Sequence, residues 1–285
     1  MWANFHTHTS YCDGKTSVDD CVQQAQALNL VSLGLSSHAP LPFDCKWCMK
    51  SDSLGAYLKD INEARARHTG IEIYKGLEID FIPGVVSPAN FRHQLDYTIG
   101  SIHFVDRFPD GRRWEIDGLH TFFLEGLEAI FQNNIQGAVT RYLALTREMI
   151  QTARPDVVGH LDKIKIQNTG DKFFSESDAW YRKEINDTLD VIAAAGVILE
   201  VNTRGIYQKK STTTYPGPWI LELAIQKNIP VTLSSDAHHP DDLVNQFTEA
   251  ATLLSDIGFR HLTILKNGSW QSTPFTPHGL SDFEF

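Results

Sequence analysis

The sequence predicts an α/β fold in which parallel strands close into a barrel. Segments with the composition of β-strands alternate with segments of helical periodicity along most of the 285 residues. This alternation favours right-handed βαβ units and a parallel sheet. Most of the strand segments end in His, Asp or Glu, and the carboxyl ends of all barrel strands meet at one rim, where barrel enzymes have their active sites. A hydrophobic fraction of 42% is enough for one large domain or two ordinary ones.

The first half of the chain contains four predicted strands. Ser17 is the expected N-cap of the first helix, with Asp20 at its N3 position, and Gly70 is expected to end the second helix. The strands are predicted at residues 2–7, 31–37, 71–80 and 95–104, and the helices at 17–29, 53–68 and, as a short helix, near 88–94. Residues 105–118 are predicted to form a long irregular stretch, and loops of this length are usually functional or disordered.

The second half contains three more strands and one further candidate. Residues 120–153 are predicted to form one or two helices with a break near Gly137, and Gly196 is expected to end a later helix. The strands are predicted at residues 155–162, 196–203 and 229–239, with a candidate eighth strand at 261–266, and the helices at 176–195, 218–227 and 241–256. The sequence contains no internal repeat and no low-complexity tract.

The first strand ends in two histidines, His6 and His8. Because alternate residues of a strand point to the same side, both imidazoles can converge on one point. Asp13 follows five residues after His8, and Gly14 permits a tight turn there. Two histidines and a carboxylate at a strand end are suitable ligands for a divalent metal ion. The pattern alone is a weak signal, since it occurs by chance in many proteins.

Later strands end in further residues of the same kind. For any single histidine, a polar strand end or a satisfied buried side chain is the more common explanation. Together, six histidines and three acids at one predicted rim favour a metal site. These residues are His6, His8, His38, His103, His160 and His238, with Asp13, Glu78 and Asp236. His239 is ambiguous, because its side chain should point away from that of its neighbour.

The formal net charge of −10 argues against a general affinity for nucleic acid or for anionic membranes, because both require a basic face. No apolar stretch reaches the length of a membrane span, and no leader of the secretory type precedes the first histidines. We therefore expect a cytoplasmic protein that acts on a small molecule, with no nucleic-acid or membrane partner. The composition indicates no particular oligomeric state.

Four cysteines lie in the first 48 residues. Cys45 and Cys48 form a C-x-x-C pair, which is typical of a redox pair or of half a zinc site. No second C-x-x-C accompanies it, and cytoplasmic proteins usually keep their thiols reduced, so we expect ordinary reduced thiols. Cys12 lies beside the presumed site and is expected to be sensitive to oxidation, without being required as a ligand.

The polar strand ends belong to longer motifs that occur together in one known family. In order, they are HTHTSYCDG at 6–14, SSH at 36–38, GLEID at 76–80, GSIHF at 100–104, VVGHLDKIK at 157–165, LEVNTRG at 199–205 and SSDAHHP at 234–240. With this set the chain resembles the PHP (polymerase and histidinol phosphatase) superfamily, and within it the histidinol-phosphate phosphatases. The resemblance implies a distorted TIM-like (β/α)7 barrel, formed as a single domain over residues 1–285, with a metal site at the carboxyl-terminal rim of the strands.

The resemblance also implies three divalent ions side by side, and zinc, iron and manganese are all compatible with mixed N/O ligands. Carried over by motif, the ligands are His6, His8, Glu78 and Asp236 for the first ion, Glu78, His103 and His160 for the second, and Asp13, His38 and His238 for the third. Glu78 then bridges the first two ions. Glu78, Asp236 and His238 are the expected catalytic residues.

The activity implied by the resemblance is hydrolysis of L-histidinol phosphate to L-histidinol and phosphate in histidine biosynthesis. Uncatalysed hydrolysis of phosphomonoesters is extremely slow, and adjacent metal ions can generate a bridging hydroxide for in-line attack. Arg204 lies just past a strand end and is a candidate for binding phosphate, although an exposed loop arginine is an equally good explanation. Lys209 and Lys210 are weaker candidates, because a lysine pair in a loop is usually solvated.

The loops at 39–50 and 104–118 are expected to shape the substrate pocket. Their aromatic side chains could stack on an imidazole and their acids could meet an ammonium group, although packing within the loop is the more common role for any one of them. The candidates are Trp47, Phe104 and Trp114, and Asp44, Asp106 and Asp117.

Two other functions are compatible with the motifs. One is a PHP-family phosphoesterase that acts on another small phosphoester or on nucleic-acid 3′ ends. The net charge of −10 and the lack of a basic stripe weigh against a nucleic-acid substrate. The other is a structural or metal-storing barrel without phosphatase activity, and the complete ligand sets weigh against it.

Overall fold

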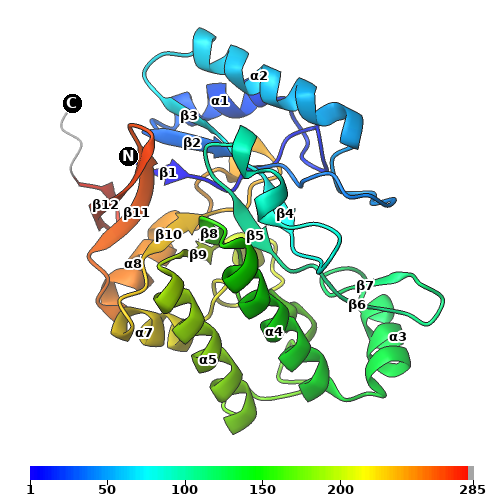
Figure 1. The fold of residues 1–285 in the computed structure, drawn as a ribbon. Coiled ribbons are helices and arrows are strands. Elements are labelled where there is room, and N and C mark those ends of the chain that lie inside the picture. Colours follow the sequence, from blue (N-terminus) through cyan, green and yellow to red (C-terminus); the bar gives the residue numbers. More distant parts are fainter. Residues whose placement is uncertain (282–285) are drawn as a thin grey trace.

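The computed structural model describes residues 1–281, so the last four residues of the predicted domain 1–285 lie outside the described residues. Strands and helices alternate over most of the chain, and the long helices lie outside the strands (Figure 1). The barrel strands are β1 (Ala3–Asn4), β2 (Ser32–Leu35), β3 (Glu72–Lys75), β4 (Glu78–Asp80), β5 (Ile99–Ser101), β8 (Val157–Val158), β9 (Ile198–Asn202) and β10 (Val231–Ser234). The other strands are β6 (Phe104–Arg107), β7 (Arg113–Glu115), β11 (His261–Lys266), β12 (Ser269–Thr276) and β13 (Gly279–Leu280).

Most predicted helices are present. They are α1 (Val18–Ala27), α2 (Leu54–Arg67), α3 (His120–Phe131), α4 (Ile135–Ala153), α5 (Ala179–Ala195), α7 (Pro218–Gln226) and α8 (Phe247–Ile257). The sequence did not predict α6 (Arg204–Tyr207), which is a single turn. Short 3-10 turns are η1 (Ser51–Ser53), η2 (Pro88–Asn90), η3 (Arg92–Gln94), η4 (Lys163–Gln167) and η5 (Pro240–Asp242). The predicted short helix near 88–94 is therefore two 3-10 turns.

The parallel strands form two sheets that join into one distorted barrel. One sheet has the order β1-β2-β3 and the other β10-β9-β8-β5-β4, and every pairing within them is parallel. Parallel bridges connect the two sheets at both edges, between Thr7 and Ala237 and between His38 and Glu78. The predicted barrel is confirmed. Because the barrel closes, the residues that follow β1, β2 and β10 lie close to the first residue of β4.

The predicted strand at 71–80 is wrong in one respect, because β3 and β4 are separate strands in different sheets. The interruption falls at Gly76, where an added Cβ would lie 2.3 Å from Cζ of the Tyr97 ring. Gly34 of β2 faces the same ring, and the buried Tyr97 hydroxyl donates to Phe5 O at 2.6 Å. A tyrosine that crosses the barrel interior therefore requires glycine on two strands. With β3 and β4 counted as one interrupted strand, the barrel has the predicted seven.

The predicted irregular stretch at 105–118 is in part a β-hairpin. β6 and β7 pair antiparallel, with a bulge between Phe104 and Asp106. The turn between them includes Gly111 at a φ of 91°. The two strands are short and mixed in polarity, so they lack the alternation that identifies a strand in sequence. The hairpin extends away from the barrel beside α3 (Figure 1).

Capping determines where the helices begin. Ser17 caps α1 and exchanges hydrogen bonds with Asp20, as predicted. The break in the predicted helix at 120–153 lies at residues 132–134, whereas Gly137 is in the first turn of α4. The Gly137 N–H donates to the Asn134 side chain at 3.0 Å. Asparagine is a preferred N-cap residue, so Asn134 predicts the start of α4 more accurately than Gly137 does.

The candidate eighth strand is β11, but it is not part of the barrel. It pairs antiparallel with β12, which in turn pairs with β13 (Figure 1). The Leu280 N–H donates to Met1 O at 2.9 Å, so this C-terminal segment contacts the beginning of the chain.

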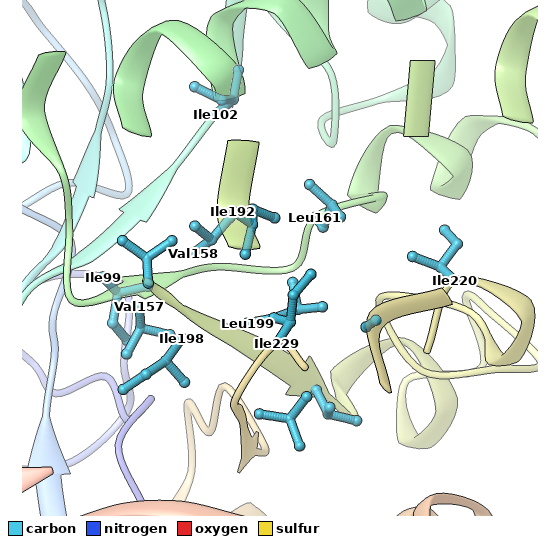
Figure 2. Packing of buried hydrophobic residues seen from close by; sticks show 14 of the residues in the cluster. Ile99, Ile102, Val157, Val158, Leu161, Ile192, Ile198, Leu199, Ile220 and Ile229 are labelled. Atoms are coloured by element: carbon cyan, nitrogen blue, oxygen red, sulfur yellow. The ribbon is translucent and has the colours of Figure 1, made fainter. Parts of the chain in front are cut away.

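The largest hydrophobic cluster supports the strands that end at the site. Ile99 of β5, Val157 of β8 and Leu199 of β9 belong to it, together with Ile192 of α5 and Ile220 of α7 (Figure 2). Close packing of these buried side chains fixes the strands, and with them the side chains at their carboxyl ends. Across residues 1–281, no helix is both long and apolar enough to cross a membrane.

Candidate metal centre

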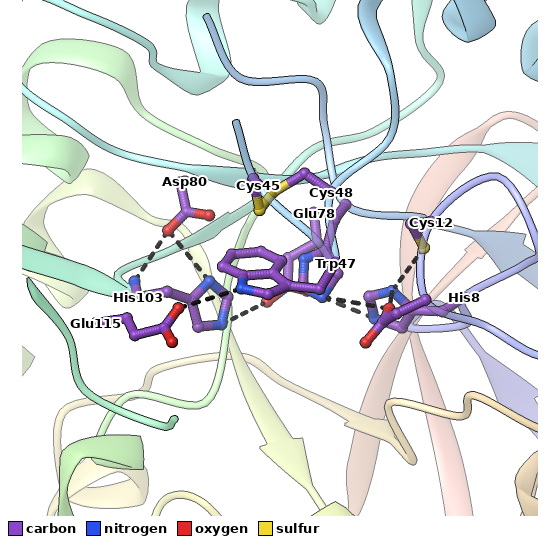
Figure 3. Close-up of a disulfide and its surroundings, with 11 residues drawn as sticks. His8, Cys12, Cys45, Trp47, Cys48, Glu78, Asp80, His103 and Glu115 are labelled. Carbon is purple, nitrogen blue, oxygen red and sulfur yellow. Dashed lines mark hydrogen bonds and ion pairs between the residues drawn. A yellow bond between two sulfur atoms is a disulfide. The ribbon is translucent and has the colours of Figure 1, made fainter. Parts of the chain in front are cut away.

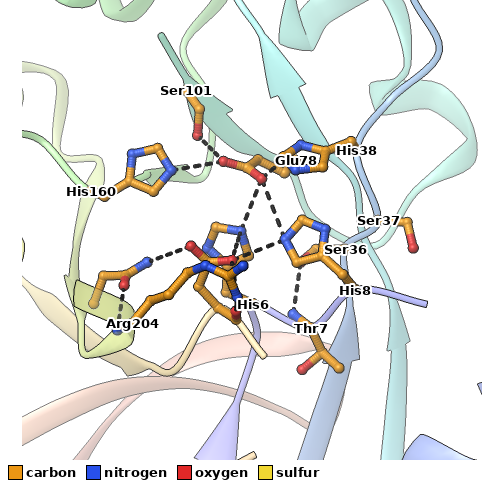
Figure 4. Close-up of polar contacts among 12 residues, drawn as sticks. His6, Thr7, His8, Ser36, Ser37, His38, Glu78, Ser101, His160 and Arg204 are labelled. Atoms are coloured by element: carbon orange, nitrogen blue, oxygen red, sulfur yellow. Dashed lines mark hydrogen bonds and ion pairs between the residues drawn. The ribbon is translucent and has the colours of Figure 1, made fainter. Parts of the chain in front are cut away.

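His6 and His8 point to the same side of the backbone that continues β1, as predicted. Their ring centroids are 5.1 Å apart. The N–H of the intervening Thr7 donates to Ser36 Oγ at 3.1 Å (Figure 4). Both histidines are buried. The end of β1 therefore contributes two imidazoles to the mouth of the barrel.

Glu78, at the start of β4, is the hub of the histidine cluster (Figure 4). Glu78 is only 2% exposed, and five imidazoles approach its carboxylate. The nitrogen-to-oxygen distances are 3.1 Å to His6 Nε2, 3.5 Å to His8 Nε2, 3.0 Å to His38 Nδ1, 3.5 Å to His103 Nε2 and 2.9 Å to His160 Nε2. The Ser101 hydroxyl also donates to Glu78, at 2.7 Å.

Asp13, Asp236 and His238 complete the cluster. Asp236 Oδ1 lies 3.2 Å from His8 Nε2, and Asp13 Oδ1 lies 3.1 Å from His238 Nε2. Asp236 has a φ of 53°, a left-handed conformation that is uncommon outside glycine and that turns the chain sharply after β10. All nine predicted ligand side chains are thus brought together at one end of the barrel. Eight of them follow the carboxyl ends of strands, whereas Glu78, predicted near the end of a strand, begins β4.

The potential ligand atoms fall into three compact groups. Within each group, atoms of all members lie within 4.8 Å of one another. The groups are His8, Asp13, His38 and His238; His6, His8 and Asp236; and His38, Glu78 and His103. The groups overlap the three predicted ligand sets, with His8 and His38 each shared between two groups. They differ in that His160 belongs to none of them and Glu78 is absent from the group of His6, His8 and Asp236.

The donor set fits divalent metal ions. Several buried atoms that face the centre make no hydrogen bond, namely His6 Nε2, His8 Nε2, His38 Nδ1, His103 Nε2 and Asp13 Oδ1. Buried polar atoms are normally hydrogen-bonded. Imidazole nitrogens and carboxylate oxygens directed at a common point are the ligands that zinc, iron and manganese take in proteins.

Buried acids make the centre strongly negative. Burial alone would lower the pKa of His103, but the carboxylates of Asp80, Asp117 and Glu78 raise that pKa to about 9. Burial opposes the protonation of His6 as well, yet Glu200, Asp236 and Glu78 raise its pKa well above the usual value. The pKa values of His8, His160 and His238 are instead lowered, first of all by burial. The buried carboxylates that act on His6 and His103 also favour a divalent cation.

Two acids behind the histidines were not identified from the sequence. Glu200 of β9 lies 2.6 Å from His6 Nδ1, and Asp80 of β4 lies 3.1 Å from His103 Nδ1. Both acids are buried. A carboxylate in this position fixes the orientation of a metal-binding imidazole. The available signal was an acid within a largely apolar strand, Glu200 in LEVN and Asp80, two residues after Glu78, in LEID.

A cavity of about 180 Å³ opens over the cluster. Among its lining residues are Trp47, Glu115, Asp117, Lys163, Arg204 and Lys210. Arg204 Nη1 donates to Asp236 O at 2.7 Å, and Lys163 Nζ lies 3.2 Å from Asp117 Oδ2. Burial alone would raise the pKa of Asp117, but Lys163 and His103 hold it at about 2. Sequence reasoning missed Lys163, which begins the 3-10 turn η4.

Only some of the loop residues predicted as candidates for substrate contact line the cavity. Trp47, Asp117 and Lys210 line the cavity, as does Arg204, whereas Phe104 stacks on Trp47 behind it. Trp114 is fully buried in the hydrophobic core, which agrees with packing, the role considered more common for each of these residues. Asp44, Asp106 and Lys209 are not among the residues that line this cavity. The ambiguous His239 is exposed, and its ring accepts the N–H of Asp241.

The cysteines differ from the prediction. Cys45 and Cys48 form a disulfide, although reduced thiols were expected (Figure 3). Their Cα atoms are 5.4 Å apart, a separation that is ordinary for a disulfide. The C-x-x-C spacing is compatible with this pairing, but the expected cytoplasmic location favoured reduced thiols. Cys12 is free, and its Sγ lies 3.4 Å from His8 Nδ1, beside the site as predicted.

The fold and the site together define a class of protein. A parallel α/β barrel with histidines and carboxylates gathered at the carboxyl ends of its strands is typical of metal-dependent barrel enzymes. The sequence profile of the PHP domain matches residues 4–204, and the chain belongs to the PHP domain family.

Relatives match nearly the whole chain. A Deinococcus radiodurans protein named "probable histidinol-phosphatase" is 30% identical over 266 residues, which are 90% of this chain and 94% of that protein. The structure of histidinol phosphate phosphatase from Lactococcus lactis, complexed with zinc, L-histidinol and phosphate, has a TM-score of 0.67 at 20% identity and covers 99% of both chains. A Listeria monocytogenes structure, provisionally assigned as a histidinol phosphatase, has a TM-score of 0.75 at 22% identity and covers 87% of this chain and 99% of its own. The two structures confirm the fold.

Proposed function

We propose that the protein is a metal-dependent phosphomonoesterase that hydrolyses L-histidinol phosphate to L-histidinol and phosphate. The observation that carries the proposal is the cluster of histidines and acids around Glu78, beneath a cavity that Arg204 and Lys163 also line. Relatives named as histidinol-phosphatases over most of this chain's length support the choice of substrate. We also propose a single domain over residues 1–285 and a cytoplasmic location, as suits an enzyme of amino-acid biosynthesis.

Nine side chains would hold three divalent ions of zinc, iron or manganese. The ligands would be His6, His8, Asp13, His38, Glu78, His103, His160, Asp236 and His238. Such ions, when bound, neutralise the charge of the phosphate and lower the pKa of the attacking water. Glu78 is the proposed bridging ligand because five imidazoles converge on its two oxygens. Asp236 and His238 are the other proposed catalytic residues, and Asp236 Oδ1 lies 3.5 Å from His238 Nδ1.

Arg204 and Lys163 would bind the phosphate group. A guanidinium can donate two parallel hydrogen bonds to phosphate oxygens, and an ammonium acts as a compact positive charge. Both side chains are already fixed, Arg204 by Asp236 O and Lys163 by Asp117. Substrate binding therefore orders little additional structure, which favours accurate positioning of the phosphorus atom.

Glu115 would meet the cationic end of the substrate. It lines the same cavity, and one of its oxygens accepts the Trp47 Nε1–H at 3.2 Å. Asp117, the other acid of residues 104–118 that lines the cavity, is already paired with Lys163. Burial raises the pKa of Glu115, because its neighbours do not fully offset the cost of burying its charge. The ammonium group of the substrate would be a cation that offsets this cost.

The test is a substrate panel with metal-replete enzyme. L-Histidinol phosphate is compared with sugar phosphates, nucleoside monophosphates and an oligonucleotide, and phosphate release is measured. We expect kcat/KM to be highest for L-histidinol phosphate and negligible in the Glu78→Gln variant. A wide preference for another phosphoester would contradict the proposed substrate, and 3′-end cleavage of the oligonucleotide would favour a nuclease.

A further inference from the structure

The disulfide between Cys45 and Cys48 encloses only Lys46 and Trp47, so it closes a very small ring at the rim of the site (Figure 3). In the portion of the chain that the structure describes, no hydrogen bond between backbone groups ties residues 40–48 to the rest of the protein. The flanking residues are tied, since the Met49 N–H donates to His38 O at 3.2 Å. The conformation of this loop is therefore restrained by side-chain contacts and by the disulfide, which joins two residues of the loop itself.

Trp47 is the side chain that this loop presents to the cavity. Its ring centroid lies 4.5 Å from that of His38 and 5.2 Å from that of His103, both in edge contacts. On its other side it stacks on Phe104 at an interplanar angle of 12°. Its Nε1–H donates to Glu115 at 3.2 Å. Trp47 thus connects two proposed metal ligands with the acid proposed to receive the substrate's positive charge.

We propose that Trp47 determines specificity for cationic phosphoesters and that the Cys45–Cys48 disulfide holds it in position. This inference rests on the proposed function and extends it to one end of the substrate. An indole ring next to a carboxylate suits a flat or cationic group such as an imidazole or an ammonium, through stacking and cation–π contact. The phosphate end would contact other residues of the same cavity, because Arg204 lies against Asp236, whereas Trp47 lies against His38 and His103.

The same arrangement makes substrate affinity sensitive to thiol redox state. A dithiol reductant attacks the disulfide and donates two electrons, the two cysteine sulfurs become thiols with two protons, and the reductant is left as a disulfide. Both cysteines are partly exposed, so a reductant can reach them. In cytoplasmic proteins, disulfides that do occur are often transient or redox-sensing. Reduction leaves the metal ligands intact and frees Trp47 to leave Glu115.

The test compares two substrates in metal-replete enzyme with equal metal content in every sample. L-Histidinol phosphate carries a positive charge, and glycerol phosphate does not. We expect Trp47→Ala and the double variant C45S/C48S to raise KM for L-histidinol phosphate about tenfold, a change equivalent to about 1.4 kcal/mol. We expect kcat for that substrate to change less than its KM, and both constants for glycerol phosphate to change less than those for L-histidinol phosphate.

Three controls make the result specific. A phosphine reductant should raise KM for L-histidinol phosphate in the wild type and have no effect on C45S/C48S. Lys46→Ala changes the exposed residue inside the ring, keeps the disulfide and should behave as wild type. Trp47→Phe keeps an aromatic ring without the N–H and should give an intermediate KM, and it remains informative if the cysteine variant fails to fold.

The possible failures are distinguishable. For each protein, KM for L-histidinol phosphate is divided by KM for glycerol phosphate. If this ratio is the same in the wild type, Trp47→Ala and C45S/C48S, the proposed role of the loop is wrong, while the phosphatase assignment stays intact. A parallel loss of activity on both substrates in Trp47→Ala would assign Trp47 a merely structural role and also overturn the inference. Absence of phosphate release from either substrate in the wild type would overturn the proposed function and this inference together.

Discussion

Glu200 Oε1 lies 2.6 Å from His6 Nδ1, and neither side chain is exposed to solvent. The other oxygen of Glu200 accepts the backbone N–H of His160 at 2.7 Å, so one buried carboxylate orients two proposed ligands. With Nδ1–H donated to Glu200, His6 directs the lone pair of Nε2 toward the centre, where Glu78 is 3.1 Å away. The carboxylate thereby selects the tautomer that can bind a metal ion.

Replacement of Glu200 by glutamine should weaken metal binding. The substitution keeps the size of the side chain but removes the negative charge that orients and polarises His6. We expect the affinity for the most weakly bound ion to fall by about 10- to 100-fold. Competition with a chromophoric chelator measures this change. Glu249→Gln, on the exposed face of α8, is the matched control. Equal affinities in the two variants would exclude the proposed role of Glu200.

His103→Ala should reduce turnover by several orders of magnitude while the far-UV circular dichroism stays unchanged. The reason is that His103 Nε2, 3.5 Å from Glu78, has no hydrogen bond and is a proposed ligand. His239→Ala removes an exposed histidine next to His238 and should retain full activity. A wild-type rate in His103→Ala would contradict the ligand assignment.

The fold was predictable where one residue pattern determines each element. Apolar runs identified the barrel strands, and Ser17 with Asp20 identified the start of α1. The split between β3 and β4 was not predictable, because it depends on the Tyr97 ring lying against Gly76, a contact between separate segments. The hairpin of β6 and β7 was missed because its strands are too short to show alternation.

The site was predictable to the extent that its motifs are local. All proposed ligands except Glu78, which begins β4, follow strand ends, and the strand order brings them together. The contribution of Lys163 depends on the path of η4 after β8, and that of Glu115 depends on the hairpin, so neither followed from spacing. The pairing of Cys45 with Cys48 depends on the conformation of a loop without backbone hydrogen bonds. Composition could not predict that conformation.

Removal of the metal ions should destabilise the folded protein. The carboxylates of Glu78, Asp236, Glu200 and Asp80 are all buried within the same centre, and without metal ions their charge is offset by the histidines, Lys163 and Arg204. An ion present at about a hundred times its Kd contributes about 2.7 kcal/mol. We expect exhaustive chelation to lower Tm by at least about 5 °C and re-addition of zinc or manganese to restore it.

The control for metal removal is the His103→Ala variant, whose Tm should respond less to the chelator because one ligand set is incomplete. Differential scanning fluorimetry provides the measurement. The prediction is wrong if the metal-free and metal-loaded wild-type proteins unfold at the same temperature.

Lys163→Met should lower kcat/KM for L-histidinol phosphate by about 10²-fold, since it removes one positive charge from the proposed phosphate site. Lys209→Met is the matched control, because Lys209 precedes the cavity residue Lys210 and does not itself line the cavity. Lys163 also neutralises Asp117, 3.2 Å away, so the single variant combines two effects. The double variant D117N/K163M separates them. It should remain as slow as Lys163→Met if Lys163 binds phosphate, whereas recovery of the wild-type rate would show that Lys163 only offsets the charge of Asp117.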